Sequence, residues 1–553
     1  MRKTQRWLVL ATVSAGLLMV SVDTTVLYTA LPTLTSALKA DAAQKLWIVN
    51  AYPLVMAGLL LGTGTLGDRI GHKRMFLTGL ALFAAASFLA AFAPSAPVLI
   101  AALAFLAVGA AAMLPATLAL IRVTFDDENE RGIAIGVWGT MAALGAALGP
   151  IVGGLLLQHF WWGSVFLLNI PVVLLAVAAT VALVPGGSGH RDRPWDLIAS
   201  LQAMVALVGL VYGIQEATRP DPVPQAIILA LLAAAAGSWM FVRRQRRQPY
   251  PLIDLSLFRN RSLLTGVIAA ALAMAATAGI DLVLTQRLQL VVSLTPLHAG
   301  LIVTAFAAGS LPVGVLAGGL LHRTGARPLI SGGLVLGALG VLVTLLLTPG
   351  AVPLLGGGRS PAWIAPGLVL AGAGLGVVMV AASAAIISGA PAQRAGMASS
   401  IESVSYELGS LAGITVLETI LTATYARTIR LPAGAPAPAA SGIDQARAAA
   451  GHLPAGQANA LLAAAASAFD NGYSLALAIT AFALAAGSAF TYRYLNRRPT
   501  TPTEQAQQLA PAHNRAARSP EQACSGRQPR VVPPKGAHSP ATTGDSDDRT
   551  HVP

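Results

Sequence analysis

The sequence contains little charge and almost no cysteine. Asp, Glu, Lys and Arg make up 11% of the 553 residues, against roughly 25% in a typical soluble domain. The single cysteine, Cys524, allows no disulfide framework and no cysteine-based metal site within one chain. No lysine follows a glycine, so the chain has no Walker A loop for ATP. These absences argue against a soluble enzyme, a disulfide-stabilised secreted domain and a pump with its own ATP site of this type.

Other chemistries also lack their sequence signals. There is no HExxH motif and no metal site in an acid-rich loop, so no metal or other cofactor is expected and a membrane-embedded enzyme is the least favoured alternative. The net charge of +13 could indicate nucleic acid. The basic residues, however, lie in short segments between apolar blocks, and we therefore expect no nucleic-acid partner.

Long apolar blocks dominate what is present. Hydrophobic residues make up 55% of the chain and gather in blocks of about 20, the length of a helix that crosses a bilayer. The first block is longer than the core of a signal peptide, and further blocks follow it directly. The sequence therefore predicts an all-α polytopic membrane protein with fourteen transmembrane helices. They are expected at about 7–32, 46–66, 75–93, 97–121, 132–157, 163–184, 195–215, 224–242, 263–287, 298–321, 327–347, 362–388, 396–424 and 472–494.

Lysine and arginine are unevenly distributed between the two sides of these spans. If the N-terminus is cytoplasmic, most of the 36 Lys and Arg residues fall on the cytoplasmic side. This bias predicts a multi-pass protein of the cell inner (plasma) membrane with both termini cytoplasmic. Residues 425–470 then form an extracellular loop, with helix-like pieces near 442–451 and 456–469. The tail, 496–553, lacks apolar periodicity and is expected to be disordered.

One short motif occurs twice. Residues 64–74 read GTLGDRIGHKR and residues 318–328 read GGLLHRTGARP. At a constant offset, the matching pairs are Gly64 and Gly318, Leu66 and Leu320, Arg69 and Arg323, and Gly71 and Gly325. Internal repeats of six-helix halves are typical of transporters. The repeat predicts two pseudo-symmetric six-helix bundles with two further helices inserted between them.

Together these features resemble the major facilitator superfamily, and within it the 14-helix drug:proton antiporters of the quaternary-ammonium exporter type. The resemblance covers residues 1–495 and depends on three motifs in the expected order. They are the span 1 motif (Asp23, Thr25, Val26, Ala30, Leu31, Pro32), the loop motif (Gly64, Leu66, Asp68, Arg69, Gly71, Lys73, Arg74) and the span 5 antiporter motif (Gly145, Gly149, Pro150, Gly153, Gly154). The resemblance implies an N-terminal bundle at 1–184, two inserted helices and a basic cytoplasmic loop at 185–262, and a C-terminal bundle at 263–495.

The loop and span 5 motifs have physical properties that suit gating. Three glycines of span 5 recur every four residues and form a smooth stripe, along which helices can approach and slide. Pro150 removes a helix hydrogen bond and permits a bend. In the loop, Gly71 permits a tight turn, while Asp68 and Arg69 could bridge helix ends in the outward-facing state. Ordinary close packing and simple positive-inside anchoring are the alternatives for the two motifs.

Several carboxylates lie within the spans, where no Lys or Arg is expected at mid-depth. The candidates for proton coupling are Asp23, Asp281, Glu402 and Glu407. Burial in hydrocarbon disfavours a charged carboxylate, so each must face water, take up a proton or meet a cation. We therefore expect them to exchange protons for substrate. A satisfied hydrogen bond between helices is the alternative for each, and Arg287 could anchor Asp281 at the outer surface.

Polar and aromatic residues of the spans are the candidate substrate site, because poorly hydrated cations bind aromatic faces. The set is Asp23, Asn50, Tyr52, Trp138, Ser310, Tyr406 and Glu407. The chain departs from the family pattern at Leu103, where relatives usually have an arginine. Some relatives also carry acids at the positions of Asn50 and Ser310. Fewer acids favour monocations or neutral antibiotics over dications.

The resemblance implies a proton-driven multidrug efflux antiporter that exports lipophilic cations or antibiotics by alternating access. Its partners would be a small-molecule substrate, protons and membrane lipid, and a monomer is expected. A dedicated exporter of one endogenous metabolite or self-made antibiotic would have the same fold, and the sequence leaves that alternative open.

Overall fold

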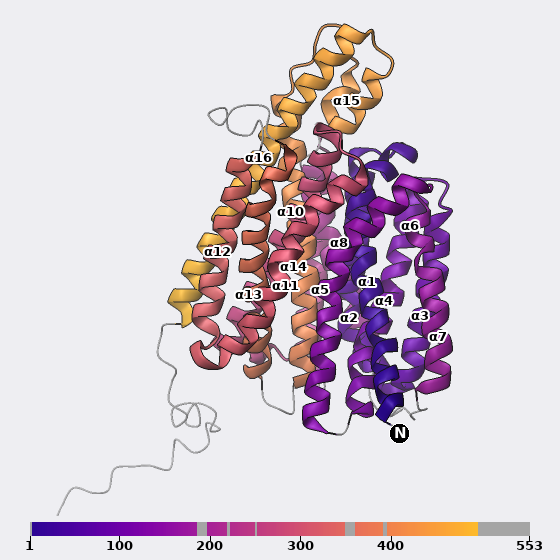
Figure 1. Ribbon diagram of the computed structural model, residues 1–553, viewed down its shortest axis with the longest axis vertical. Helices are drawn as coiled ribbons and strands as arrows, with labels where there is room; N and C mark the ends of the chain where they lie inside the picture. Colours follow the sequence, from indigo (N-terminus) through magenta and orange to yellow (C-terminus); the bar gives the residue numbers. More distant parts are fainter. Residues whose placement is uncertain are drawn as a thin grey trace, which may run out of the picture. The chain divides into compact units, whose positions relative to one another are not determined.

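The computed structural model describes residues 3–125, 127–184, 196–217, 222–248, 252–348, 360–390 and 395–495. Every regular element in these ranges is helical (Figure 1). Thirteen helices are long and apolar enough to cross a membrane, and α2 (Ala42–Ile70), bent by 56° between Leu60 and Gly62, provides the fourteenth span. The chain is therefore a multi-pass membrane protein, and the predicted number of spans is confirmed. The predicted disorder of the tail, 496–553, concerns residues outside those described.

The first half of the chain forms one bundle with its own core. It comprises α1 (Lys3–Ala37), α2, α3 (His72–Ala91), α4 (Ala96–Thr124), α5 (Glu128–His159), and the short α6 (Ser164–Leu167), which leads into α7 (Asn169–Leu183). Buried side chains from all of these helices make a continuous apolar cluster, which includes the fully buried Phe76 and Phe83 of α3 and extends to a few residues of the second half, such as Leu282 and Ile414. Leu103 is part of this cluster and is fully buried. An apolar residue therefore fills the position where relatives usually have an arginine.

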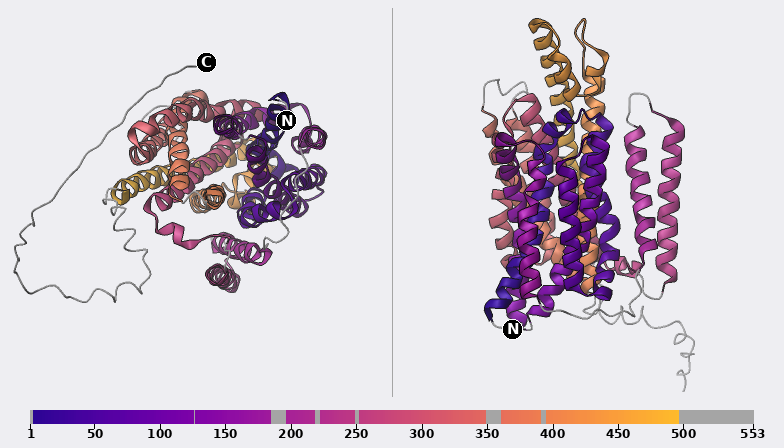
Figure 2. Two further views of the ribbon diagram at one scale, coloured as in Figure 1. Left: turned by 90° about the horizontal axis from the view of Figure 1, so that it is seen from below. Right: turned by 90° about the vertical axis from the view of Figure 1, so that its right-hand side faces the viewer.

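The second half forms a bundle of its own around a separate apolar cluster. It comprises α10 (Arg261–Gln286), α11 (Pro296–Thr324), α12 (Ala326–Leu347), α13 (Ala365–Ser388), α14 (Ala395–Thr428) and α16 (Ala455–Leu495). A π-helical turn, η2 (Arg287–Val291), continues α10. Between the halves in sequence, α8 (Leu197–Ala217) and α9 (Pro224–Arg247) pack against each other, and α8 contacts α2. Figure 2 shows this pair at the side of the molecule.

The two copies of the repeated motif form the same turn. Gly71 joins α2 to α3 with a φ of 96°, and Gly325 joins α11 to α12 with a φ of 77°. Both values lie in the region that glycine adopts readily and other residues rarely do. Each motif therefore needs its glycine to reverse the chain between neighbouring helices.

The last transmembrane helix is longer than predicted. The sequence suggested a separate helical piece at 456–469, followed by a span from 472. Instead α16 is one helix of 41 residues from Ala455 to Leu495. The alanine-rich segment contains no proline, and alanine has the highest helix propensity, so nothing interrupts the helix before the membrane. The predicted piece at 442–451 corresponds to α15 (Ile443–Ala450).

The segment from the end of α14 through α15 to the start of α16 projects beyond the other helices, and the N-terminus lies at the opposite end (Figure 1). The end of the bundle that carries this projection is called the α15 end.

Small residues allow the helices within each bundle to approach closely, and this generates a prediction. A Cβ on Gly374 of α13 would lie 2.6 Å from the Gly333 carbonyl of α12, whereas one on Gly332 would meet nothing within 4 Å. We expect Gly374→Val to lower the free energy of unfolding by about 1–3 kcal/mol through overpacking. Gly332→Val is the control and should have a much smaller effect. Thermal unfolding of the purified protein measures both variants, and equal effects would contradict the packing argument.

Candidate functional site

The two halves meet closely at the α15 end, where α5 packs against α11. A Cβ on Gly154 of α5 would lie 2.5 Å from the Cα atom of Leu297 on α11. One on Gly300 would collide with the backbone of Pro150. The Thr304 hydroxyl of α11 also donates to the Ala147 carbonyl at 3.4 Å. Two residues of the span 5 motif, Pro150 and Gly154, therefore form part of the contact between the halves.

The same two helices are apart at the opposite end. Gly136 lies about five turns before Gly154 on the same face of α5, and Gly318 lies about five turns after Gly300 on the same face of α11. A Cβ at either Gly136 or Gly318 would meet no atom of the described residues within 4 Å. The halves are thus closed against each other at the α15 end and separated at the other end.

The remaining residues of the two motifs stay within the N-terminal half. In α5, Gly145 packs against Ser21 of α1, and Gly149 and Gly153 follow along the same helix. In the loop motif, Asp68 lies 3.4 Å from His72. Gly64 of the same motif faces Pro115 of α4. The side chains of Arg69 and Arg74 are exposed.

Lys73, next to these exposed arginines, connects the loop motif to another helix. Its ammonium donates to the Val184 carbonyl at 2.6 Å and to the Val181 carbonyl at 3.2 Å. The lysine therefore binds the carbonyl end of α7, where the helix leaves backbone acceptors without partners.

Asp23 is buried inside the N-terminal bundle and has a specific partner. The Asn169 amide of α7 donates to the Asp23 carboxylate at 2.8 Å and approaches the Ser87 hydroxyl of α3 at 3.1 Å. These contacts connect α1, α7 and α3. Neither Asn169 nor Ser87 was among the predicted site residues, although Asn169 is a polar residue within an apolar run. Asp23 thus has the helix-to-helix hydrogen bond that the sequence left as an alternative.

A second group of polar side chains lies where the halves face each other. Tyr52 of α2 is within electrostatic range of Asp23 and of Glu407 on α14. Tyr28 of α1 approaches the Ser410 side chain and is within electrostatic range of Glu407 and Asp281. The structure therefore brings four of the predicted residues into one region: Asp23, Tyr52, Asp281 and Glu407. Tyr28, five residues after Asp23 in the span 1 motif, belongs to that region but was not predicted.

Two carboxylates of this region have no partner in the part of the chain that the structure describes. The Asp281 Oδ1 atom is buried without a hydrogen-bond partner there, and no hydrogen bond or ion pair of Glu407 is found among those residues. The Asn50 amide, fully buried, and the Tyr52 hydroxyl also lack described partners. Buried polar groups without protein partners commonly bind water or ligand. This region can therefore accept a proton or a cation.

The other predicted residues lie elsewhere. On α14, Glu402 accepts a hydrogen bond from the Tyr406 hydroxyl at 2.6 Å. The Trp138 indole donates to the Thr117 hydroxyl of α4 at 3.0 Å, inside the N-terminal bundle. Ser310 packs against Gly376 of α13. Among the described residues, no group of three or more His, Cys, Asp or Glu side chains is placed to hold a metal.

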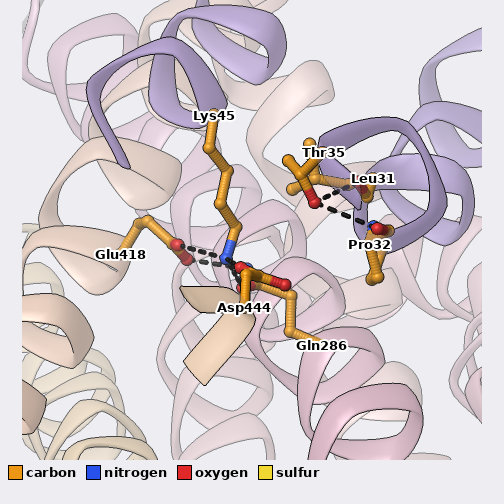
Figure 3. Close-up of polar contacts among 7 residues, drawn as sticks. All are labelled: Leu31, Pro32, Thr35, Lys45, Gln286, Glu418 and Asp444. Atoms are coloured by element: carbon orange, nitrogen blue, oxygen red, sulfur yellow. Dashed lines mark hydrogen bonds and ion pairs between the residues drawn. The ribbon is translucent and has the colours of Figure 1, made fainter. Parts of the chain in front are cut away.

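A buried ion cluster at the α15 end was not predicted from the sequence. Lys45, treated as a loop residue, is buried near the start of α2, and its ammonium lies 3.3 Å from Glu418 and 3.0 Å from Asp444 (Figure 3). It also donates to the Gln286 amide oxygen, and the Gln286 amide nitrogen donates to Glu418 at 2.7 Å. The contact joins residues far apart in sequence, so the opposite charges of Lys45 and Glu418 were the only feature of the sequence from which this ion pair could have been predicted.

The sequence left open that Arg287 anchors Asp281 at the outer surface, but the structure pairs this arginine with another acid. Arg287 instead lies 2.7 Å from Asp470 of α16, and its guanidinium also lies over the Tyr473 ring. Because α16 extends beyond the predicted start of the last span, it brings Asp470 within reach of Arg287.

Comparisons with known proteins agree with this architecture. The sequence profile described as Major Facilitator Superfamily matches residues 13–414. The methyl viologen resistance protein SmvA of Salmonella typhimurium is 40% identical over 481 residues, covering 86% of this chain and 95% of its own length. The multidrug efflux pump LfrA of Mycolicibacterium smegmatis is 36% identical and covers 88% and 95%. The tetracenomycin C resistance and export protein of Streptomyces glaucescens is 31% identical and covers 88% and 91%.

Two solved structures share the fold at low sequence identity. A bacterial homologue of the human lysosomal transporter Spinster, in an inward-facing and unoccupied conformation, aligns with a TM-score of 0.63. It is 16% identical and covers 91% of this chain and 100% of its own. The peptide transporter POT in complex with sulfate has a TM-score of 0.59 at 16% identity, covering 89% and 95%.

The Asp23 contacts generate a prediction about stability. Asn169→Leu removes the donor to the buried Asp23 carboxylate, which should lower the free energy of unfolding by about 1–3 kcal/mol. Asp23→Asn should cost less, because a neutral amide is easier to bury and can still pair with Asn169. Thermal unfolding of both variants measures the difference, with Thr140→Val on the exposed face of α5 as the control. Unchanged stability of Asn169→Leu would refute the role of this hydrogen bond.

Proposed function

The chain belongs to the Major Facilitator Superfamily, and we propose that it is a proton-driven efflux antiporter that exports lipophilic cations or antibiotics by alternating access. The observation that carries the proposal is the asymmetry of α5 and α11, which touch at Gly154 and Gly300 and are apart at Gly136 and Gly318. A transporter that opens to one side at a time needs such an arrangement. The names of the relatives, which refer to methyl viologen resistance, multidrug efflux and tetracenomycin C export, support drug-like substrates.

We place the protein in the inner membrane of the cell, with the α15 end outside and both termini in the cytoplasm. The arginines at the end of α9, opposite the α15 end, support this orientation. The structure then corresponds to an inward-facing state, ready to take substrate from the cytoplasm or the inner leaflet. Each half contributes to the central region, so a monomer is sufficient. Exposed apolar side chains on α9, such as Leu229 and Leu232, suit contact with lipid.

We assign proton coupling first to Glu407 and Asp281. Neither has a described ion partner, and a substrate cation can neutralise a carboxylate that a proton otherwise neutralises. Tyr28 and Tyr52 are close enough to take part in substrate binding. Asp23, which accepts a hydrogen bond from Asn169, contributes to proton coupling through its electrostatic interaction with Tyr52. Glu402 lies one to two turns from Glu407 on α14.

The energetics favour more than one acid. Exchange of one monocation for one proton moves no net charge, so the membrane potential adds nothing. A second proton adds one charge, worth about 2.3 kcal/mol per 100 mV. That energy corresponds to more than one extra decade of concentration gradient at about 1.4 kcal/mol per decade.

A dedicated exporter of one compound is the second candidate. Its support is the relative named for tetracenomycin C resistance and export, which is 31% identical over 506 residues. The same fold and the same acids would serve both functions. The range of compounds that the protein exports separates the two candidates. No observation among the described residues favours a membrane-embedded enzyme.

The coupling proposal predicts the loss of proton exchange in acid variants. Glu407→Gln should reduce proton release from purified protein on addition of a cationic dye to below about one tenth, because the proton-binding group is gone. Asp281→Asn should reduce it partially. Glu130→Gln, which changes a surface acid paired with Arg6, is the control. Release that is unchanged in Glu407→Gln would rule out this acid as the coupling site.

The small number of acids predicts a preference among substrates. In proteoliposomes under imposed pH and voltage gradients, monocationic dyes should be exported faster than dications of similar size, because fewer carboxylates can neutralise them. The relative named for resistance to methyl viologen, a dication, makes this comparison informative. Faster export of dications would overturn the preference. It would leave the antiport proposal in place if transport still follows the pH gradient.

A further inference from the structure

A buried lysine of one half is bound by three acceptors of the other half. Lys45 lies in the first turn of α2, the second helix of the N-terminal half. Its partners are Gln286 at the end of α10, Glu418 on α14 and Asp444 on α15, which all belong to the C-terminal half. Figure 3 shows the ammonium between the three side chains. The side chains of Lys45 and Glu418 are only 11% and 4% exposed, so bulk water screens this pair weakly.

Further contacts strengthen the same seam. The Gln289 amide of η2 donates to the Thr29 carbonyl of α1 at 2.8 Å, which is another polar contact between the halves. Arg447 of α15 donates to the Leu290 carbonyl and lies 3.2 Å from the Ser293 hydroxyl. α15 is therefore held to the end of α10 by Arg447 while Asp444, one turn earlier, reaches Lys45. The short helix links the two halves.

The charges of this cluster cannot separate without water. If the halves part at the α15 end, Lys45 leaves with one half, and Glu418 and Asp444 remain on the other. Removing one partner of a buried ion pair is strongly unfavourable, because the remaining charge is uncompensated. A small cavity lined by Lys45, Glu418, Asp444 and Tyr425 lies beside the cluster. It provides room for water to reach the ions as the seam opens.

We propose that Lys45, Glu418, Asp444 and Gln286 form a latch that holds the α15 end closed and sets the balance between the inward- and outward-facing states. The latch stabilises the state seen here, in which α5 and α11 also touch at Gly154. Opening on the outside requires the lysine to exchange three protein acceptors for water. The proposal depends on the alternating access of the proposed function but not on proton coupling.

The test is a distance measurement between spin labels in a Cys524→Ser background, which has no other cysteine. Labels at Ser36→Cys on α1 and Ala426→Cys on α14, both exposed, report on the α15 end. Labels at Ile133→Cys on α5 and Leu320→Cys on α11 report on the opposite end. Lys45→Met should raise the ratio of open to closed molecules at the α15 end by about tenfold or more, because two buried carboxylates lose their cation. The distance between the second pair should shorten in step.

Matched variants separate a latch from general loosening. Asp444→Asn weakens the latch, whereas Asp470→Asn weakens the Arg287 pair, which lies entirely within the C-terminal half. We expect a shift with Asp444→Asn and none with Asp470→Asn. The double exchange Lys45→Glu with Glu418→Lys should return the distances toward those of the unchanged protein.

The measured distances either support the latch or overturn it. Unchanged distances in both Lys45→Met and Asp444→Asn overturn the latch, as do equal shifts in Asp444→Asn and Asp470→Asn. If Lys45→Met does not fold, Asp444→Asn alone decides. The distances are measured without substrate or a pH gradient. A failure of proton coupling, seen as absent proton release, is therefore distinguishable from a failure of the latch.

Discussion

An ionised side chain at the depth of a membrane is stable only if it has an opposite charge or water beside it. Four acids of this chain illustrate two classes under that constraint. Glu418 and Asp470 lie near the α15 end and have resident partners, Lys45 and Arg287. Asp281 and Glu407 lie where the halves face each other and have none among the described residues. The first class connects helices to one another, and the second is the pair to which we assign proton coupling.

Glycine determines how the halves can meet. The span 5 motif presents one set of glycines to α1 and Gly154 to α11, so one helix serves both the interior of its bundle and the contact between bundles. Because Gly154 and Gly300 have no side chain, the backbone of the facing helix, at Leu297 and Pro150, approaches each of them closely, and the contact at these positions is made largely between backbones. Such a surface has few interlocking side chains to disengage when it parts, which leaves polar contacts such as those of Lys45 to resist opening.

Much of the architecture could be read from the sequence, because membrane spans depend on local composition. Apolar blocks gave the fourteen spans, and the repeated glycine turn gave the two halves. The failures involve contacts between residues far apart in the chain. Lys45 was predicted to be a charged loop residue, because its partners come from three other elements and cannot be found from the local sequence. They are Gln286, Glu418 and Asp444. Asn169 was missed because a single polar residue in an apolar run does not identify the acid it binds. The length of α16 was underestimated because its first part, 456–469, was predicted as a helix separate from the span that begins at 472.

The continuous α16 has a mechanical consequence. Its 41 residues span about 60 Å, roughly twice the hydrocarbon thickness of a bilayer. A helix of that length without an interrupting proline behaves as a lever whose base is embedded in the C-terminal bundle. A tilt of about 10° at its base would move its far end by about 10 Å. Small rotations inside the membrane therefore become large, easily detected displacements of the projecting tip.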